Sequence, residues 1–160
     1  MMRDLLAFPD TSRVWIYQAD EPLPEESIHD INRLISQFAV QWTSHNMQLK
    51  ATGGLLHDRF LVLVADESHA GASGCSIDTS VRFIKQLGEK YKRDFFDRFT
   101  FAYLDGDQVK SIHRDALAEA YRSGTITDDT LFFDNLVSDK GAFIKRWLAP
   151  FGESWMKRFV

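Results

Sequence analysis

The segment Phe60-Leu-Val-Leu-Val-Ala65 is the longest apolar run in the chain, and the predicted fold is built around it. A run of this length suits a β-strand and is much shorter than the about 20 residues of a membrane-spanning helix. Before it, Met47, Leu49 and Ala51 alternate with polar residues. This alternation predicts a second strand that continues to Leu56 and pairs with the apolar run as a hairpin.

The turn of this hairpin has two candidate positions. The polar sequence His57-Asp-Arg59 leaves the apolar run intact as a strand and is the preferred turn. Alternatively, the turn lies at Gly53-Gly54, because two glycines suit a tight hairpin loop.

A helix is predicted on each side of the hairpin in sequence, the first from Pro24 to Trp42 and the second from about Asp78 to Tyr91. Proline suits the first turn of a helix. Apolar residues recur at steps of three and four in both segments, a pattern typical of helices that bury one face. These residues are Ile28, Ile31, Leu34, Ile35, Phe38, Ala39 and Trp42 in the first helix, and Val81, Ile84, Leu87 and Tyr91 in the second.

The remaining elements complete a mixed pattern. A first strand is expected at Arg13–Tyr17 and a fourth at 99–103, which returns as a hairpin through Asp105-Gly106. The later elements are a short helix at about 114–122, a short strand at 130–134 and a last helix capped by Ser138. The first six elements have the order β-α-β-β-α-β. This order predicts a single α+β domain over residues 1–160, with a split βαβ (ferredoxin-like) core and a C-terminal hairpin/helix extension.

The composition is that of an ordinary globular chain, with 160 residues, a formal net charge of −4, 44% hydrophobic and 26% charged residues. The 9 Gly and 4 Pro are too few for a collagen-like or low-complexity chain. The single cysteine, Cys75, excludes an intrachain disulfide, and no secretory signal is recognisable at the N-terminus. We therefore expect a cytoplasmic protein without a membrane partner. The acidic balance argues against nucleic acid as a partner, although basic residues gather in 82–98 and 140–158.

The segment 71–78, between the apolar strand and the second helix, has the composition of an anion-binding loop. Its glycines allow the backbone to turn several amides toward one point, and the exposed amides of a helix start favour negative charge. The expected ligand-binding residues are Gly71, Ser73, Gly74, Cys75, Ser76, Asp78 and Arg82. A small anionic molecule is therefore the predicted partner. The alternative is a capped helix start, in which the same residues only satisfy backbone groups.

The same region contains residues that suit a small enzyme, the first alternative function. Cys75 precedes the helix, where a thiol can act as a nucleophile if a histidine serves as its base. The carboxylates of Asp66, Glu67 and Asp78 can hold Mg²⁺ near a strand end. We nevertheless expect no metal site and no cofactor. The histidines show no HxH or HExxH spacing, and the nucleotide motifs GxxxxGK[ST] and GxGxxG are absent from the sequence.

The C-terminal segment ends in aromatic residues, Phe151, Trp155 and Phe159, next to Lys157 and Arg158. We expect this tail to close the core, or alternatively to form a partner-binding surface. Homodimerisation through the tail or through a sheet face is the second alternative function.

Five stretches carry a resemblance to known sequences. They are Ser12–Tyr17 (SRVWIY), Phe38–Trp42 (FAVQW), Asp66–Ser68 (DES), Gly71–Asp78 (GASGCSID) and Ser80–Ile84 (SVRFI). In these stretches, and over most of its length, the chain resembles an uncharacterised bacterial family of proteins of about this size, often labelled "ABC transporter ATPase". The resemblance implies no particular reaction and no catalytic residue.

Overall fold

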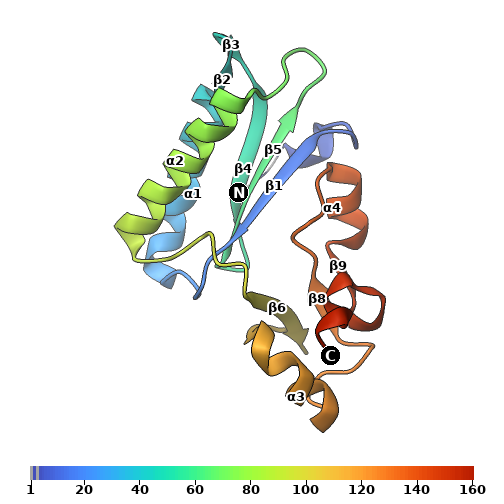
Figure 1. Ribbon diagram of the computed structural model, residues 1–160. Coiled ribbons are helices and arrows are strands. Elements are labelled where there is room, and N and C mark those ends of the chain that lie inside the picture. The colour runs from blue at the N-terminus through green and yellow to red at the C-terminus, as the bar shows by residue number, and fades with distance from the viewer. Residues whose placement is uncertain (1, 3) are drawn as a thin grey trace.

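Strand β5 (Phe60–Asp66) is the centre of the first sheet. The computed structural model describes residue 2 and residues 4–160 of the chain. In it, β5 pairs antiparallel with β1 (Arg13–Gln18) along one edge and with β4 (Lys50–Leu56) along the other. β1 and β4 therefore run parallel to each other with β5 between them (Figure 1). All seven residues of β5 are buried.

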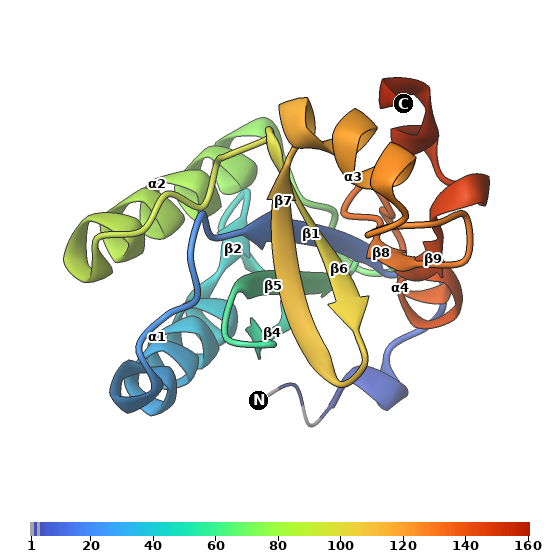
Figure 2. The ribbon, with the colours of Figure 1, turned by 90° about the horizontal axis from the view of Figure 1, so that it is seen from below.

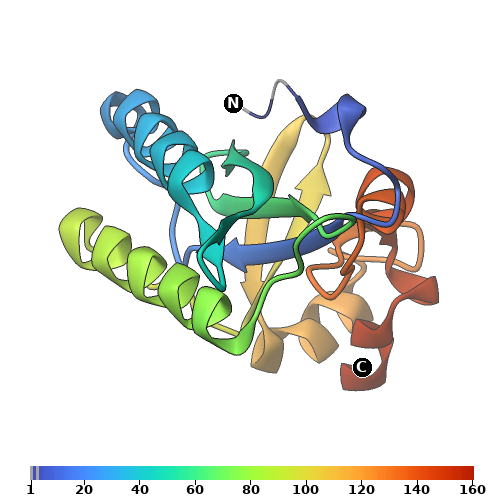
Figure 3. The ribbon, with the colours of Figure 1, turned by 90° about the horizontal axis from the view of Figure 1, so that it is seen from above.

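Both faces of β5 are covered by other elements. On one face, the odd-numbered residues 61–65 pack in a core with helices α1 (Ile28–Gln41) and α2 (Gly74–Tyr91). On the other face, the even-numbered residues 60–64 pack in a second core with side chains from the C-terminal half of the chain. Figure 3 shows the two helices together on one side of the sheet. Most of the stripe predicted for each helix thus faces β5. In α2, Val81 was predicted in the stripe but is not part of this core, and Phe83 packs against it instead.

The turn between β4 and β5 is formed by residues 57–59, so the preferred position is confirmed and the alternative at Gly53-Gly54 is wrong. Two residues of this turn have positive φ angles. Gly53 instead lies inside β4, where a Cβ would come within 2.8 Å of the carbonyl oxygen of Val62. The glycine therefore permits a close approach of neighbouring backbone and helix rather than a turn.

A second sheet lies against the other face of β5. Its strands follow the order β7 (Gln108–His113), β6 (Thr100–Asp105), β8 (Leu131–Phe133) and β9 (Leu148–Pro150), and all its pairs are antiparallel. The β6–β7 hairpin crosses the first sheet (Figure 2). Arg59, in the turn before β5, donates from Nη2 to the carbonyl oxygen of Val109 at 3.0 Å and so ties the two sheets together. With its helices and its antiparallel sheets, the protein is a mixed α+β structure.

The ferredoxin-like core expected from the sequence is not confirmed. In that arrangement the strand after the second helix pairs with the outer edge of the first strand. Here β6 pairs with β7 and β8 instead. The outer edge of β1 is met at its start by another segment, because the amide of Val14 donates to the carbonyl oxygen of Ser138 at 2.9 Å. Near its end, Gln18 Nε2 donates to the carbonyl oxygen of Thr100 at 3.1 Å. A side chain, and not a strand ladder, thus joins β1 to β6.

Helix α1 begins after a 3₁₀ turn at Glu25–Ser27, close to the predicted start. Part of its predicted apolar face is less buried than expected. The buried positions of α1 are Ile31, Ile35 and Ala39, and the half-buried ones are Ile28, Leu34 and Phe38, which pack at the margin of the core. Trp42, just after the helix, is buried as predicted.

The remaining elements are short. They are β2 (Thr43–Ser44), which pairs with β3 (Met47–Gln48), the helices α3 (Leu117–Ser123) and α4 (Lys140–Arg146), and 3₁₀ turns at Leu5–Ala7, Arg114–Ala116, Phe151–Glu153 and Trp155–Phe159. Helix α4 is capped by Asp139 and not by Ser138, since the Asp139 carboxylate accepts from the amide of Ala142 at 2.7 Å. In the tail, Phe151 and Met156 are buried in a third core with residues of β6 and β8. No helix in the described part of the chain is long and apolar enough to cross a membrane.

Replacing Ile35 with alanine should lower the free energy of unfolding by about 2–5 kcal/mol, because its side chain is fully buried and its loss leaves a cavity. Val40→Ala is the matched control, since Val40 lies on the same helix and is 64% exposed. This control should change stability by no more than about 0.5 kcal/mol. Urea unfolding followed by circular dichroism measures both variants, and equal effects would contradict the placement of the buried face.

The ring of His57 packs against Phe133 and Trp147, with ring centroids 5.3 and 5.9 Å away. Burial, followed by the charge of Arg59, lowers the pKa of His57 below its ordinary value of 6.5. The folded protein therefore binds a proton at His57 less readily than the unfolded chain does. The stabilisation from this site is complete above pH 6.5 and decreases as the pH falls below that value.

We expect His57→Asn to reduce the loss of stability on acidification from about pH 7.5 to about pH 5. His45→Asn is the control, because His45 is exposed and its backbone has the same φ of 51° as that of His57. Urea unfolding at the two pH values measures the effect. A wild-type pH dependence in the His57 variant would show that the packed ring does not titrate as described.

Candidate functional site

Helix α2 begins at Gly74 and not near Asp78, so most of the predicted loop 71–78 forms the first turn of the helix. Ser73 is the N-cap, and its hydroxyl oxygen accepts from the amide of Ser76 at 3.1 Å. In return, the amide of Ser73 donates to the hydroxyl oxygen of Ser76 at 2.7 Å. This reciprocal pair is a capping box. Ser73 and Ser76, which the sequence predicts to bind a ligand, therefore hydrogen-bond to each other at the start of α2.

Further groups around this loop also bind within the protein. The amide of Ala72 donates to the Glu67 carboxylate at 2.7 Å. The carbonyl oxygen of the buried Ser76 accepts from the indole Nε1 of Trp42 at 2.8 Å. These bonds attach the loop to the end of β5 and to the end of α1.

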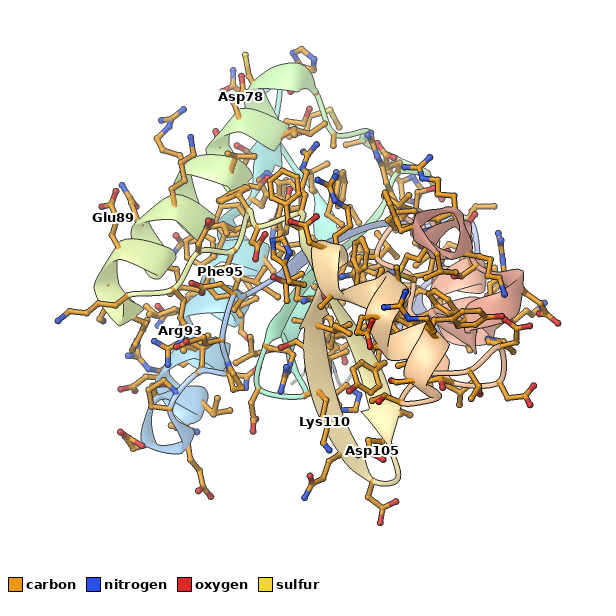
Figure 4. The ribbon with its side chains drawn as sticks, turned by 60° about the horizontal axis from the view of Figure 1, so that its bottom comes forward. Asp78, Glu89, Arg93, Phe95, Asp105 and Lys110 are labelled. Carbon is orange, nitrogen blue, oxygen red and sulfur yellow. The ribbon has the colours of Figure 1, made fainter. Side chains whose placement is uncertain are left out.

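The other predicted ligand-binding residues lie at the surface. The exposed ones are Gly71, Gly74, Cys75, Asp78 and Arg82. A Cβ added at Gly74 would meet no atom within 4 Å. Figure 4 shows Asp78 near the N-terminal end of α2. The hydrogen bonds of this segment are those of a capped helix start, the alternative interpretation. Anion binding at this segment stays a prediction.

The carboxylates considered for an enzyme bind separate groups. Asp66 accepts from the amide and the hydroxyl of Ser68 at 3.0 and 2.5 Å, and these hydrogen bonds lower the pKa of Asp66. Glu67 binds the amide of Ala72, and Asp78 is exposed on α2. Within residues 2 and 4–160, no group of three or more His, Cys, Asp or Glu side chains is placed to hold a metal ion.

A pocket lies elsewhere, between β1, the segment 95–101 and the C-terminal tail, and we call it the β1 pocket. Its volume is 510 Å³, which falls in the range of about 300–1,000 Å³ typical of small-molecule sites. Much of its wall is aromatic. The rings belong to Tyr17, Phe95, Phe96, Phe99, Phe101, Phe133, Trp155 and Phe159.

The charged residues of the β1 pocket are mostly positive. Arg98, Arg114 and Arg158 line it together with a single acid, Asp97. Among residues 2 and 4–160, Arg98 and Arg158 take part in no ion pair. Arg114 has a long contact of 3.8 Å with the exposed carboxylate of Asp115. The pocket therefore carries positive charge that the protein does not balance.

Aromatic rings and a local turn hold the charged groups of this pocket. The guanidinium carbon of Arg114 lies 4.8 Å from the centre of the Phe99 ring, and that of Arg158 lies 5.0 Å from the centre of the Phe159 ring. A cation–π contact of this kind restricts a guanidinium without using its N–H groups. Asp97 accepts from the amide of Phe99 at 2.8 Å and so is engaged in a turn.

A chain of hydrogen bonds forms the polar part of the wall. Asn135 Nδ2 donates to Gln18 Oε1 at 2.9 Å, and Gln18 Nε2 binds the carbonyl oxygen of Thr100. Trp147 Nε1 in turn donates to Asn135 Oδ1 at 3.0 Å. Burial raises the pKa of Tyr17 above its ordinary value of 10.0. The hydrogen bonds of Gln18 and Asn135 link β1 to the start of β6 and to Trp147.

A second pocket of 520 Å³ lies where α2 ends, around Glu89, Arg93 and Phe95 (Figure 4). Arg93 donates from Nε and Nη2 to the carbonyl oxygen of Pro22 at 3.0 and 2.8 Å. Its guanidinium therefore anchors the segment before α1. The β1 pocket, with its unbalanced arginines, is the stronger candidate site.

The sequence does contain signals for the β1 pocket, although they do not point to a common site. Arg98 and Arg158 belong to the two basic stretches, and Trp155 and Phe159 belong to the aromatic tail. These segments are far apart in the chain, and no spacing rule relates them. Their meeting is a result of tertiary packing.

No family model, curated protein or solved structure matches the chain. The resemblance to a bacterial family therefore stays a prediction, and the function is argued from the geometry of the chain itself.

Ser73→Ala should lower the free energy of unfolding by about 1 kcal/mol, because it removes the N-cap of α2. Ser36→Ala is the control, since Ser36 is an exposed serine within α1, and its effect should stay within about 0.5 kcal/mol. Urea unfolding measures both variants. A Ser73 variant as stable as the wild type would contradict the capping role of Ser73.

Anion binding at this segment has its own test. Movement of the amide resonances of residues 74–79 in an NMR titration with millimolar phosphate would support it.

Proposed function

We propose that the protein binds a ligand with an anionic group and an apolar or aromatic body in the β1 pocket. The observation that carries this proposal is the excess of positive charge, since Arg98, Arg114 and Arg158 share the pocket with Asp97 alone. Charges of one sign in a cleft with low-dielectric walls attract ligands of the opposite sign. A carboxylate or phosphate on the ligand would provide the partner that the arginines lack.

The cation–π contacts of the arginines support this ligand class. A guanidinium held by a ring in a cation–π contact can still use its planar set of N–H groups to bind the two oxygens of a carboxylate or a phosphate. Arg114 and Arg158 both have this environment. Because the rings already restrict these side chains, binding would cost less conformational entropy than it would with free arginines.

Exposed apolar surface near the arginines supports an apolar part of the ligand. Phe99 is 51% exposed and Leu136 is 69% exposed, and both line the β1 pocket. A ligand body seated between them would remove apolar surface from water, which is favourable by about 25 cal/mol per Å².

The proposal keeps the ligand class predicted from the sequence and changes its location. The anionic ligand was expected at residues 71–78, where the donors cap α2. The two alternatives rest on the sequence alone. They are an enzyme that uses Cys75 or the carboxylates of Asp66, Glu67 and Asp78, and a homodimer.

Phenyl phosphate is a suitable probe, because it combines a phosphate with one aromatic ring. We expect it to shift the amide resonances of residues 95–101 in an NMR titration of the full chain. Arg114→Ala and Arg158→Ala should each weaken binding by about tenfold, the loss expected when a charge-assisted hydrogen bond is removed.

Arg146→Ala is the control, since Arg146 is an exposed arginine on α4 that does not line the pocket. It should bind phenyl phosphate as the wild type does, and phenol should bind more weakly than phenyl phosphate. An equal loss of affinity in all three arginine variants would contradict a specific site, because it would show that binding depends only on the net charge of the protein. Unmoved resonances of residues 95–101 at millimolar phenyl phosphate would refute the proposal.

A further inference from the structure

The outer edge of β1 turns backbone hydrogen-bonding groups toward the β1 pocket. Just after β1, the amide of Ala19 donates to the carbonyl oxygen of Arg59 at 2.8 Å. Given the register of the two strands, the odd-numbered residues of β1 therefore form the hydrogen-bonded pairs with β5. The even-numbered residues direct their N–H and C=O groups away from β5. Val14 confirms this direction, because its amide donates to the carbonyl oxygen of Ser138 on the far side.

The two ends of this outer edge are covered, and its middle is open. Ser138 covers one end, and at the other end the amide of Asp20 donates to the carbonyl oxygen of Asp94 at 2.9 Å. Between them, the backbone N–H and C=O of Ile16 have no hydrogen-bond partner within residues 2 and 4–160. Both Ile16 and Gln18 line the β1 pocket. An unpaired strand edge of this kind is a template for another extended backbone.

We propose that the ligand of the β1 pocket is an acidic peptide segment that adds to this edge as a short strand. The inference rests on the proposed function and specifies its ligand class. A strand advances about 3.3 Å per residue, so the open stretch around Ile16–Gln18 accommodates about three or four residues. The main-chain bonds to Ile16 provide affinity, and the side chains provide selectivity, as in other cases of strand addition.

Charge complementarity favours an acidic peptide over a basic one. Three arginines face the pocket with Asp97 as the single acid, and Asp97 is already bound to the amide of Phe99. Successive side chains of an added strand point to opposite sides. Acidic side chains on one side would pair with the arginines, and apolar side chains on the other would pack on the aromatic wall.

A peptide also completes the site in a way that an anion without a backbone does not. Such an anion binds the arginines and the rings and leaves the N–H and C=O of Ile16 unpaired. A peptide backbone binds both groups. The free edge and the arginines are separate observations, and the same ligand accounts for both.

The test is an NMR titration of the isotope-labelled full chain with a capped tetrapeptide of alternating glutamate and valine. Two further peptides carry a single backbone N-methyl group, each on one of the two central residues. Adjacent residues of a strand direct their N–H groups to opposite edges. One methylated peptide should therefore bind about tenfold more weakly than the parent, and the other should bind as the parent does. The parent peptide should also slow solvent exchange of the Ile16 amide.

Phenyl phosphate and a tetrapeptide with lysine in place of glutamate complete the comparison. Equal binding of the two methylated peptides, an unchanged exchange rate at Ile16, or equal binding of the lysine peptide would overturn strand addition by an acidic peptide. If phenyl phosphate still binds in that case, the proposed small-anion function stands. If neither phenyl phosphate nor the glutamate peptide shifts the pocket resonances, both proposals fail. Every titration uses the same unsubstituted protein, and only the added molecule changes. Loss of protein folding therefore cannot produce any of these outcomes.

Discussion

Burial of β5 on both faces is the constraint on which the rest of the structure depends. A strand with no solvent-facing side needs a layer of structure on each face. Helices α1 and α2 form one layer, and the second sheet with α4 forms the other. Aromatic contacts hold the second layer in place, since the ring of Phe60 lies 4.8 Å from that of Phe133 and 4.9 Å from that of Trp147. The two halves of the chain thus complete one another across a single strand.

The same constraint opens the β1 pocket. The β6–β7 hairpin covers the second face of β5 by crossing the first sheet instead of extending it (Figure 2), and the other edge of β6 pairs with β8. Among residues 2 and 4–160, the backbone along this edge is then bound only near its ends, by Ser138 and, just beyond the strand, by Asp94, while the side chain of Gln18 reaches the carbonyl oxygen of Thr100. Arginines from the segment 95–101, from the 3₁₀ turn after β7 and from the C-terminal tail line the space that remains.

The loop before α2 shows why composition alone does not identify a site. A capped helix start and an anion-binding loop both use small residues, hydroxyl groups and exposed amides. What separates them is where the hydroxyl groups point. Ser73 and Ser76 bind each other's amides, and Glu67 accepts from the amide of Ala72. These bonds follow from backbone angles that a residue list does not contain.

The sequence by itself determined the elements whose signals are local: the apolar strand 60–65, the helix that ends near Trp42, and the hairpin turns at 57–59 and after Asp105. Periodicity and turn chemistry act over a few residues, so they can be read directly. Only the tertiary structure decided which edge β6 joins and that Arg98 and Arg158 line the same pocket. Strand edges far apart in the chain compete for the same partner, and the outcome depends on packing against both faces of β5, which no local pattern records.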